Sequence, residues 1–240
     1  HTGILTNGIL LDEAFIARLR PYLTQGALSL SISLDALTPE IHDDIRAMKG
    51  SFEKTLAGLK ILSRLKKDHP SINFNVISII LNTNLEQLLP LANFLRSLNI
   101  NSLQFQPLLA NNLVMKERRH DGGYWVPADR LPLLDSVVDD LVLFKRRHGG
   151  FIRNSEKNLL LVKKYFRGLL NESDVSCLHA NKTVLISDEG YATTCFDSYG
   201  AIRNKSLKDI YLSEQADSAR VRALRCKSPC LLPCFMDYDE

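Results

Sequence analysis

All five cysteines of this 240-residue chain lie in its last third, and their spacing could build a metal site. They are Cys177, Cys195, Cys226, Cys230 and Cys234. The first two flank a glycine in the pattern Cys-x12-Gly-x4-Cys, and the last three recur at four-residue intervals. Thiolates bind one metal centre only where they converge, and short intervals favour that convergence. Four sulfur ligands suit zinc or an iron–sulfur cluster, so the cysteines alone leave both open.

A hairpin is predicted between the first two cysteines. Residues 184–186 and 191–193 resemble short strands, and they bracket a loop in which Gly190 supplies a positive φ. Folding back would return Cys195 toward Cys177, and the last three cysteines would then supply two more ligands and leave one thiol spare. A zinc knot is the alternative to a cluster. His179 lies close to Cys177, but a lone histidine is more often packed or exposed, so we leave it out of the site.

The composition is that of an ordinary globular protein, with 45% hydrophobic and 24% charged residues. A net charge of +3 is too small to indicate nucleic acid as a partner. No run approaches the roughly 18 apolar residues of a membrane span, so no membrane partner is expected. An odd number of cysteines argues against a complete disulfide framework and favours a reducing, cytoplasmic compartment. The chain begins at His1 rather than at a methionine, and we treat it as a fragment.

Helical and strand-like patterns alternate from about residue 10 to residue 109. One helix is expected at 11–23, ending near Pro21, and a second is expected to start at residue 51. A third helix is expected to start from a cap at Asn84, with Gln87 completing a capping box. Strands are expected at 28–34, 72–81 and 102–108. This order predicts βαβ units and a parallel sheet. Two of the strands alternate apolar residues with Ser or Gln, which favours a partial barrel whose inner wall is partly polar. An ordinary α/β sheet with one wetter face is the alternative.

Polar groups recur where each expected strand ends. They are Thr6-Asn7-Gly8, Ser33-Leu34-Asp35, Asn82-Thr83-Asn84 and Gln106-Pro107. In parallel barrels the reactive groups sit at the C-terminal ends of the strands, so we expect these residues to share one edge. Ser33 and Asp35 are two residues apart on a strand and should both point into the lumen.

These segments resemble the radical S-adenosylmethionine (radical SAM) enzymes. The resemblance rests on Leu5-Thr6-Asn7-Gly8, Ser31-Ile32-Ser33-Leu34-Asp35, His42-Asp43-Asp44-Ile45-Arg46 and Gly50-Ser51-Phe52. It implies an α/β fold, a partial (β/α)6 TIM-like barrel. A [4Fe-4S] cluster at its mouth reduces S-adenosyl-L-methionine to a 5′-deoxyadenosyl radical, which abstracts a hydrogen atom from the substrate. The family's Cys-x3-Cys-x2-Cys triplet is absent; we attribute this to truncation before residue 1, and a degenerate non-enzyme is the alternative.

The tail resembles the SPASM module, or its shortened twitch form, whose pattern is Cys-x9–15-Gly-x4-Cys followed by a cysteine cluster. Five thiolates can saturate one [4Fe-4S] cluster but not two, which favours the twitch form with one auxiliary cluster. The resemblance therefore implies metal ligands among Cys177, Cys195, Cys226, Cys230 and Cys234.

The resemblance also implies which residues hold S-adenosyl-L-methionine. They are Asn7, Gly8, Ser33, Asp35, Arg46, Asn82 and Gln106. The guanidinium of Arg46 suits the methionine carboxylate. Without the family, Arg46 would be expected to pair with Asp43 or Glu53. The implied partners are a reductant such as flavodoxin or ferredoxin and a peptide or small-molecule substrate.

We therefore expect a barrel over residues 1–110 that lacks its first strands, a helical connector over 111–176, and a small Cys-rich α+β domain over 177–240. Helices are expected at 131–144 and 159–170, and Trp125 either contacts substrate or packs. The full-length protein is expected to be an enzyme, and residues 1–240 alone to be poorly soluble and inactive. The alternative is a zinc-stabilised binding protein on a degenerate barrel.

Overall fold

The computed structural model describes residues 2–109, 123–175, 183–194, 197–203, 205–225 and 231. The chain divides into two compact units. Residues 1–108 and 122–166 form the first unit, and residues 109–121 and 167–240 form the second. Within the described ranges, every helix is too short or too polar to cross a membrane.

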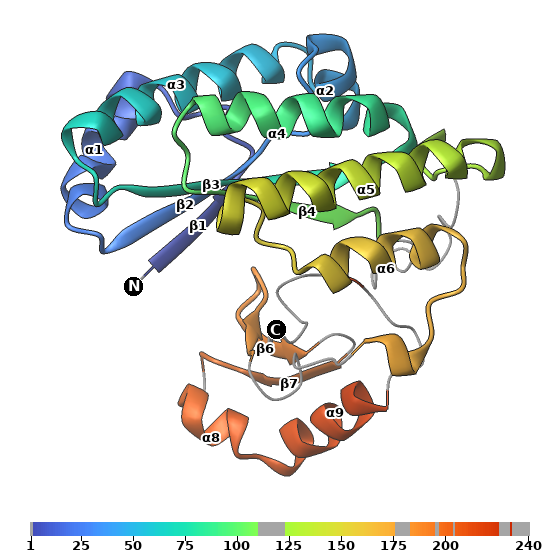
Figure 1. The fold of residues 1–240 in the computed structure, drawn as a ribbon. Coiled ribbons are helices and arrows are strands. Elements are labelled where there is room, and N and C mark those ends of the chain that lie inside the picture. The colour runs from blue at the N-terminus through green and yellow to red at the C-terminus, as the bar shows by residue number, and fades with distance from the viewer. Residues whose placement is uncertain are drawn as a thin grey trace. The chain divides into compact units, whose positions relative to one another are not determined.

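A parallel four-stranded sheet forms the centre of the first unit, in the order β1-β2-β3-β4. The strands are β1 (Thr2–Thr6), β2 (Leu28–Ser33), β3 (Asn73–Ile80) and β4 (Ser102–Pro107). The connections contain α1 (Glu13–Thr24), α2 (Pro39–Ile45), α3 (Ser51–Asp68), the 3-10 helix η1 (Asn82–Gln87) and α4 (Leu88–Ser97). Figure 1 shows α1 to α4 over one face of this sheet. The predicted βαβ order and parallel sheet are confirmed.

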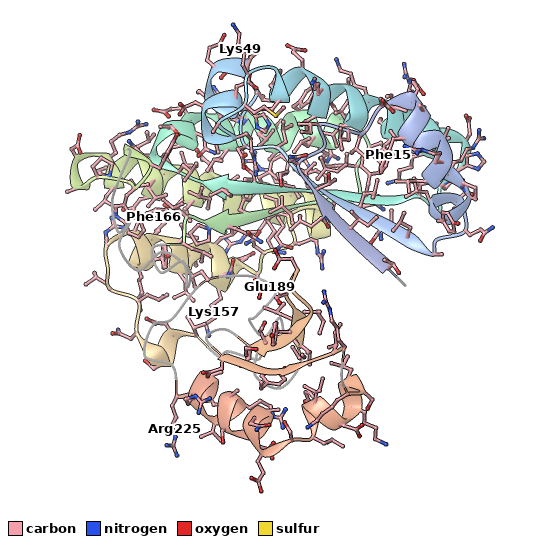
Figure 2. The ribbon with its side chains drawn as sticks, turned by 180° about the vertical axis from the view of Figure 1, so that it is seen from behind. Phe15, Lys49, Lys157, Phe166, Glu189 and Arg225 are labelled. Carbon is pink, nitrogen blue, oxygen red and sulfur yellow. The ribbon has the colours of Figure 1, made fainter. Side chains whose placement is uncertain are left out.

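The two faces of the sheet differ in chemistry because each strand alternates its side chains. On the helix-covered face, Ile32, Phe74, Val76 and Phe105 are completely buried. On the other face, Ser31 of β2 stands opposite Asn75 of β3 in the ladder, and their side chains are hydrogen-bonded, with Ser31 Oγ and Asn75 Nδ2 3.0 Å apart. Apolar packing under helices on one side and hydrogen-bonding groups on the other is the pattern of a barrel wall. Figure 2 shows the side chains of this unit from behind.

The helix predicted from a cap at Asn84 begins later than expected. Asn84 lies inside η1, and α4 starts at Leu88 with Gln87 at its N-cap. The Asn84 side chain is fully buried and accepts a hydrogen bond from the backbone N–H of Leu81 (2.9 Å). Its amide nitrogen donates to the backbone carbonyls of Asp35 and Ile79, both at 2.7 Å. The residue therefore joins the ends of two strands, a role that local capping patterns do not reveal.

A short segment after α5 extends the sheet beyond β4. The helices here are η3 (Ala128–Arg130), α5 (Leu131–His148), η4 (Gly149–Phe151) and α6 (Glu156–Phe166). Ile152 forms a parallel bridge with Leu103. The side-chain amide of Asn154 accepts from the backbone N–H of Phe105 and donates to its carbonyl, both at 2.7 Å. Both expected helices are present, and the bridge and the paired amide satisfy part of the edge of β4.

The second unit contains a small antiparallel sheet with two helices. Its elements are η5 (Glu172–Asp174), β5 (Leu185–Ile186), β6 (Tyr191–Thr194), β7 (Asp197–Ala201), α8 (Leu207–Tyr211) and α9 (Glu214–Leu224). The β5–β6 hairpin confirms the prediction; its loop is closed by Gly190 at φ +83°, and Figure 2 places Glu189 at its tip. The core consists of Ala192, Tyr199, Ile210, Ala216 and Ala219.

Candidate functional site

The C-terminal ends of the four parallel strands bring the predicted residues of the first unit to one edge of the sheet. At the end of β1 the chain makes a tight turn at Gly8, which has φ +84°. A Cβ placed on Gly8 would lie 2.9 Å from Thr55 Cγ2 and 3.0 Å from Ile32 Cγ2. The Thr55 hydroxyl donates to the backbone carbonyl of Asn7 at 2.8 Å. Gly8 thus permits a turn that a larger residue could make under α3 only with strain.

Asp35 and Arg46 form an ion pair at the end of β2. Arg46 Nη2 lies 2.6 Å from Asp35 Oδ2, and Asp35 is completely buried. The other carboxylate oxygen accepts from the backbone N–H of Ile79 at 2.9 Å. The structure gives Arg46 a partner that differs from Asp43 and Glu53, the two expected without the family. Because Asp35 is enclosed, with Oδ2 in the ion pair and Oδ1 hydrogen-bonded to Ile79, it serves to hold Arg46 and to join β2 to β3.

His42 belongs to the same group, although the sequence motif gave it no role. It is completely buried, and its Nδ1 accepts the backbone N–H of Asp35 at 3.2 Å. Burial, the largest influence, lowers the pKa of His42 below 6.5; Asp35 acts against this and Arg46 with it. Nδ1 also lies 3.6 Å from Asp35 Oδ2. Because Nδ1 accepts this hydrogen bond, it carries no proton itself, as in a neutral imidazole ring. The spacing of four residues between His42 and Arg46, one helical turn, is the sequence signal that could have found it.

Asp43 caps the helix that follows. Its Oδ1 accepts from the Ser51 hydroxyl and the Phe52 backbone N–H, both at 2.8 Å, and its Oδ2 accepts from the Gly50 N–H at 2.5 Å. Burial opposes ionisation, but these hydrogen bonds from Phe52, Gly50 and Ser51 outweigh it and hold the pKa of Asp43 below 3.8. The carboxylate at the N-terminus of α3 therefore fixes the loop that carries Arg46.

Asn82, at the end of β3, is tied to the segment that precedes α5. Its backbone N–H donates to the carbonyl of Tyr124 at 2.8 Å, and its side-chain amide donates to the carbonyl of Gly123 at 2.9 Å. The Tyr124 hydroxyl donates to Asp44 of α2 at 3.0 Å. Burial, together with this contact, raises the pKa of Tyr124 above 10.0. Tyr124 thus spans from the end of β3 to α2 beside Arg46.

Among the predicted residues, Ser33 and Gln106 have side chains that are still available for hydrogen bonding. Both side chains are half-buried, and neither makes a hydrogen bond with the rest of the described residues. In the ladder, Ser33 stands opposite Ile77 and Gln106 opposite Ile79, so both lie on the polar face. Asn7 is exposed. The structure thus brings the seven predicted residues to one edge, but it commits Asp35 to structural bonds and leaves Ser33 and Gln106 open.

Some buried polar atoms at this edge have no hydrogen-bond partner among the described residues. His42 Nε2, Arg46 Nε and Asn82 Oδ1 are among the buried polar atoms that make no hydrogen bond with the described residues. Buried polar groups are normally paired, so unpaired ones gathered at one place suit a polar ligand or water.

The other predicted site lies outside the described residues. Cys177, Cys195, Cys226, Cys230 and Cys234 all fall there, and so does His179. Among the described residues, no group of three or more His, Cys, Asp or Glu side chains gathers as a metal site would require. Trp125, the other candidate, packs against Phe166 and Tyr165, with ring centroids 4.7 and 5.6 Å apart.

Comparison with known proteins gives the barrel segment a family. Residues 1–95 match the Radical SAM superfamily. The AdoMet-dependent heme synthase of Methanosarcina barkeri is 38% identical over 85 residues, 35% of this chain and 22% of that protein. The antilisterial bacteriocin subtilosin biosynthesis protein AlbA of Bacillus subtilis is 38% identical over 61 residues, 25% of this chain and 13% of that protein.

Solved structures extend the likeness in fold. The structure of native anSMEcpe with bound AdoMet and a Cp18Cys peptide matches with a TM-score of 0.63 at 16% identity, covering 93% of this chain and 60% of that one. A second structure, native anSMEcpe with bound AdoMet, matches with a TM-score of 0.61, covering 90% of this chain and 58% of that one. This chain thus spans under a quarter of the curated relatives and about three fifths of the solved ones. The four-stranded parallel sheet resembles part of a TIM-like barrel, and residues 1–95, which contain its first three strands, match the Radical SAM superfamily.

Proposed function

We propose that the full-length protein is a radical SAM enzyme that forms a 5′-deoxyadenosyl radical and uses it to abstract a hydrogen atom from a peptide. The observation that carries the proposal is the strand-end edge. Its residues up to Asn82 lie within residues 1–95, the range that matches the superfamily, and the edge carries buried polar atoms without partners. S-adenosyl-L-methionine and its [4Fe-4S] cluster, when bound, supply the radical. The residues of this chain bind and orient.

Arg46 fits the role of carboxylate ligand. Its side chain is 22% exposed, and only Nη2 is engaged, by Asp35. The remaining N–H groups of the guanidinium are available for the methionine carboxylate, while the buried Asp35 fixes the plane of the fork. Asp35 itself, fully buried and bonded to Ile79, does not fit as a direct contact, so we assign it to positioning Arg46.

The other assigned contacts differ in how well the residues suit them. Ser33 and Gln106 have uncommitted polar side chains on the polar face, which suits hydrogen bonds to a ribose and an adenine. Asn82 has its amide nitrogen engaged but its Oδ1 without a described partner, so it can accept one hydrogen bond. Gly8 can contribute only backbone groups, and Asn7 is exposed beside it.

We assign the cysteines to one auxiliary [4Fe-4S] cluster of the twitch or SPASM kind, in a reducing, cytoplasmic compartment and served by a reductant such as flavodoxin or ferredoxin. The β5–β6 hairpin supports the assignment because it is the element that would bring Cys195 back toward Cys177. A peptide substrate is supported by the peptide bound in the anSMEcpe structure and by the bacteriocin named for AlbA.

The test is anaerobic purification of the full-length protein after reconstitution with iron and sulfide. We expect brown protein with broad charge-transfer absorption, about four irons per cluster, and 5′-deoxyadenosine formed from S-adenosyl-L-methionine with a low-potential reductant. Arg46→Lys should weaken S-adenosyl-L-methionine binding, with Arg147→Lys on α5 as the matched control. A colourless protein containing zinc and forming no 5′-deoxyadenosine would overturn the proposal in favour of a binding protein.

A further inference from the structure

The polar face of the sheet carries almost no charge. The strands present Gly3, Leu5, Ser29, Ser31, Ser33, Asn73, Asn75, Ile77, Ile79, Ser102, Gln104 and Gln106 on this face, as the ladder register shows. All of these side chains are neutral. Asp35, which follows β2 at its C-terminal end, carries a carboxylate, but this is paired with Arg46. Burying a substrate's charge against such a wall would be costly unless something else on the face compensated it.

A described residue that can compensate a negative charge of the substrate is Arg153, which lies beyond β4. Ile152 is bridged to Leu103, and the backbone N–H of Arg153 donates to the Leu103 carbonyl at 2.8 Å. Arg153 therefore stands next to Gln104 in the extended ladder. Ile152 is completely buried and Asn154 is 1% exposed, whereas Arg153 is exposed. Because side chains alternate along an extended chain, Arg153 is on the polar face.

The backbone of Arg153 is held on both sides. Ile152 is packed in the core, and Asn154 makes its paired hydrogen bonds to Phe105 and donates a further one to Asn158 at 2.6 Å. An arginine on such a fixed backbone loses less conformational entropy when it binds than one on a free loop would.

The charge of Arg153 is not neutralised by a described residue. The nearest carboxylate in sequence, Glu156, is bound by Arg146 through two hydrogen bonds, at 2.9 Å from Nε and 2.6 Å from Nη2. No ion pair joins Arg153 to any other described side chain. A guanidinium fork in a neutral, hydrogen-bonding surround matches a carboxylate, which it can bind with two parallel N–H···O bonds.

We propose that Arg153 binds a carboxylate of the substrate, while neutral polar groups of the same face form hydrogen bonds with the peptide amides around it. This inference rests on the proposed function and gives it a substrate class, a peptide with an acidic side chain near the reacting residue. The acidic group is bound at the side of the sheet formed by β4 and Arg153. The apolar positions Ile77 and Ile79 lie between that side and Ser33 and contact the neighbouring carbon atoms of the peptide.

The test uses full-length reconstituted protein and synthetic peptide libraries with blocked termini, in which one position is Glu, Gln or Lys. Retained peptides are counted by mass spectrometry under anaerobic conditions with S-adenosyl-L-methionine present. We expect wild type to enrich Glu over Gln peptides about tenfold, the value of one charge-assisted contact. Arg153→Gln should lose that preference and Arg153→Glu should shift it toward Lys. Arg147→Gln, the same loss of charge on α5, should keep the Glu preference.

Two further readouts separate the inference from the function on which it rests. S-adenosyl-L-methionine binding and the 5′-deoxyadenosine formed without substrate should be equal in wild type and Arg153→Gln. If every variant forms 5′-deoxyadenosine but wild type shows no Glu preference, or Arg153→Gln keeps it, the inference is wrong while the proposed function stands. Displacement of the peptides by a tetrapyrrole dicarboxylate, with an equal loss in Arg153→Gln, would move the carboxylate to a different substrate class and overturn the peptide assignment. If no protein forms 5′-deoxyadenosine, the proposed function fails.

Discussion

The two units of this chain are stabilised in different ways. In the first unit, large side chains such as Leu59, Phe74 and Phe105 are completely buried between helices and sheet. In the second, the described core is made mostly of alanine, and Leu212 and Leu224 are 64% and 54% exposed. Apolar burial contributes roughly 25 cal/mol per Å², so a core of small side chains gains much less. The first unit can therefore fold by burial, whereas the described core of the second gains less from burial and would benefit from a further source of stability.

The cysteines offer that source. All five belong to the second unit, and metal binding by thiolates is coupled to folding because the ligand set does not exist in the unfolded chain. The first unit thus carries its candidate site on a well-packed sheet, whereas we propose that the second unit is stabilised by its own cluster.

The largest expected effect is on the second unit. Cys177→Ala or Cys195→Ala should each remove about four irons, the content of one cluster, and make the second unit sensitive to protease while the first unit stays resistant. Iron analysis and limited proteolysis of the full-length protein measure both. Of Cys226, Cys230 and Cys234, two should behave like the first pair and one should be tolerated. Iron retained in the Cys177 or Cys195 variant would sink the hairpin pairing, and iron lost in all five would indicate two clusters or a partner's ligand.

The next effect lies in the first unit and should leave iron content unchanged. Phe74→Ala removes a completely buried ring and should lower the free energy of unfolding of that unit by about 3–5 kcal/mol. Leu212→Ala, at a 64% exposed position of the second unit, should change its stability by less than about 0.5 kcal/mol. Urea unfolding followed by circular dichroism gives both values. Equal losses in the two variants would contradict the contrast between the cores.

Much of the first unit could be predicted from sequence because its signals are periodic. The strand expected at 28–34 is β2 at Leu28–Ser33, and the helix expected from residue 51 is α3. The helix expected to end near Pro21 instead continues to Thr24 with the proline inside it. Periodicity finds such elements since side-chain alternation follows directly from strand and helix geometry.

The site could be predicted only in part because its decisive bonds join residues that are distant in sequence. Asn84 reaches back 49 residues to the carbonyl of Asp35, and Asn154 reaches back 49 residues to Phe105. Local patterns suggested a helix cap for Asn84 and nothing for Asn154. Placing Asp35 at the strand end was possible from alternation, but its pairing with Arg46 and the burial of His42 depend on how α2 packs, which no local pattern specifies.

A smaller effect concerns the turn that places Asn7. Gly8→Ala should destabilise the first unit by about 1–3 kcal/mol, because alanine is strained at φ +84° and its Cβ would press on Thr55 and Ile32. Gly150→Ala is the matched control, since a Cβ there meets nothing within 4 Å. Thermal unfolding measures the stability of both variants, and the Gly8 variant should be the less stable of the two. A Gly8 variant as stable as the Gly150 variant would mean that the turn can relax without cost.

The smallest effect is a pH dependence of the first unit. Because the folded pKa of His42 lies below 6.5, the folded state binds fewer protons than the unfolded state at mildly acidic pH. The stability contributed by the neutral ring is therefore full above about pH 6.5 and is lost as pH falls toward the folded pKa, with a slope of at most about 1.4 kcal/mol per pH unit. His42→Gln keeps an acceptor for the Asp35 N–H but cannot titrate, so its urea-unfolding free energy should change less than that of wild type between pH 7.5 and pH 5.5. An identical slope in wild type and His42→Gln would show that another group carries the acid sensitivity.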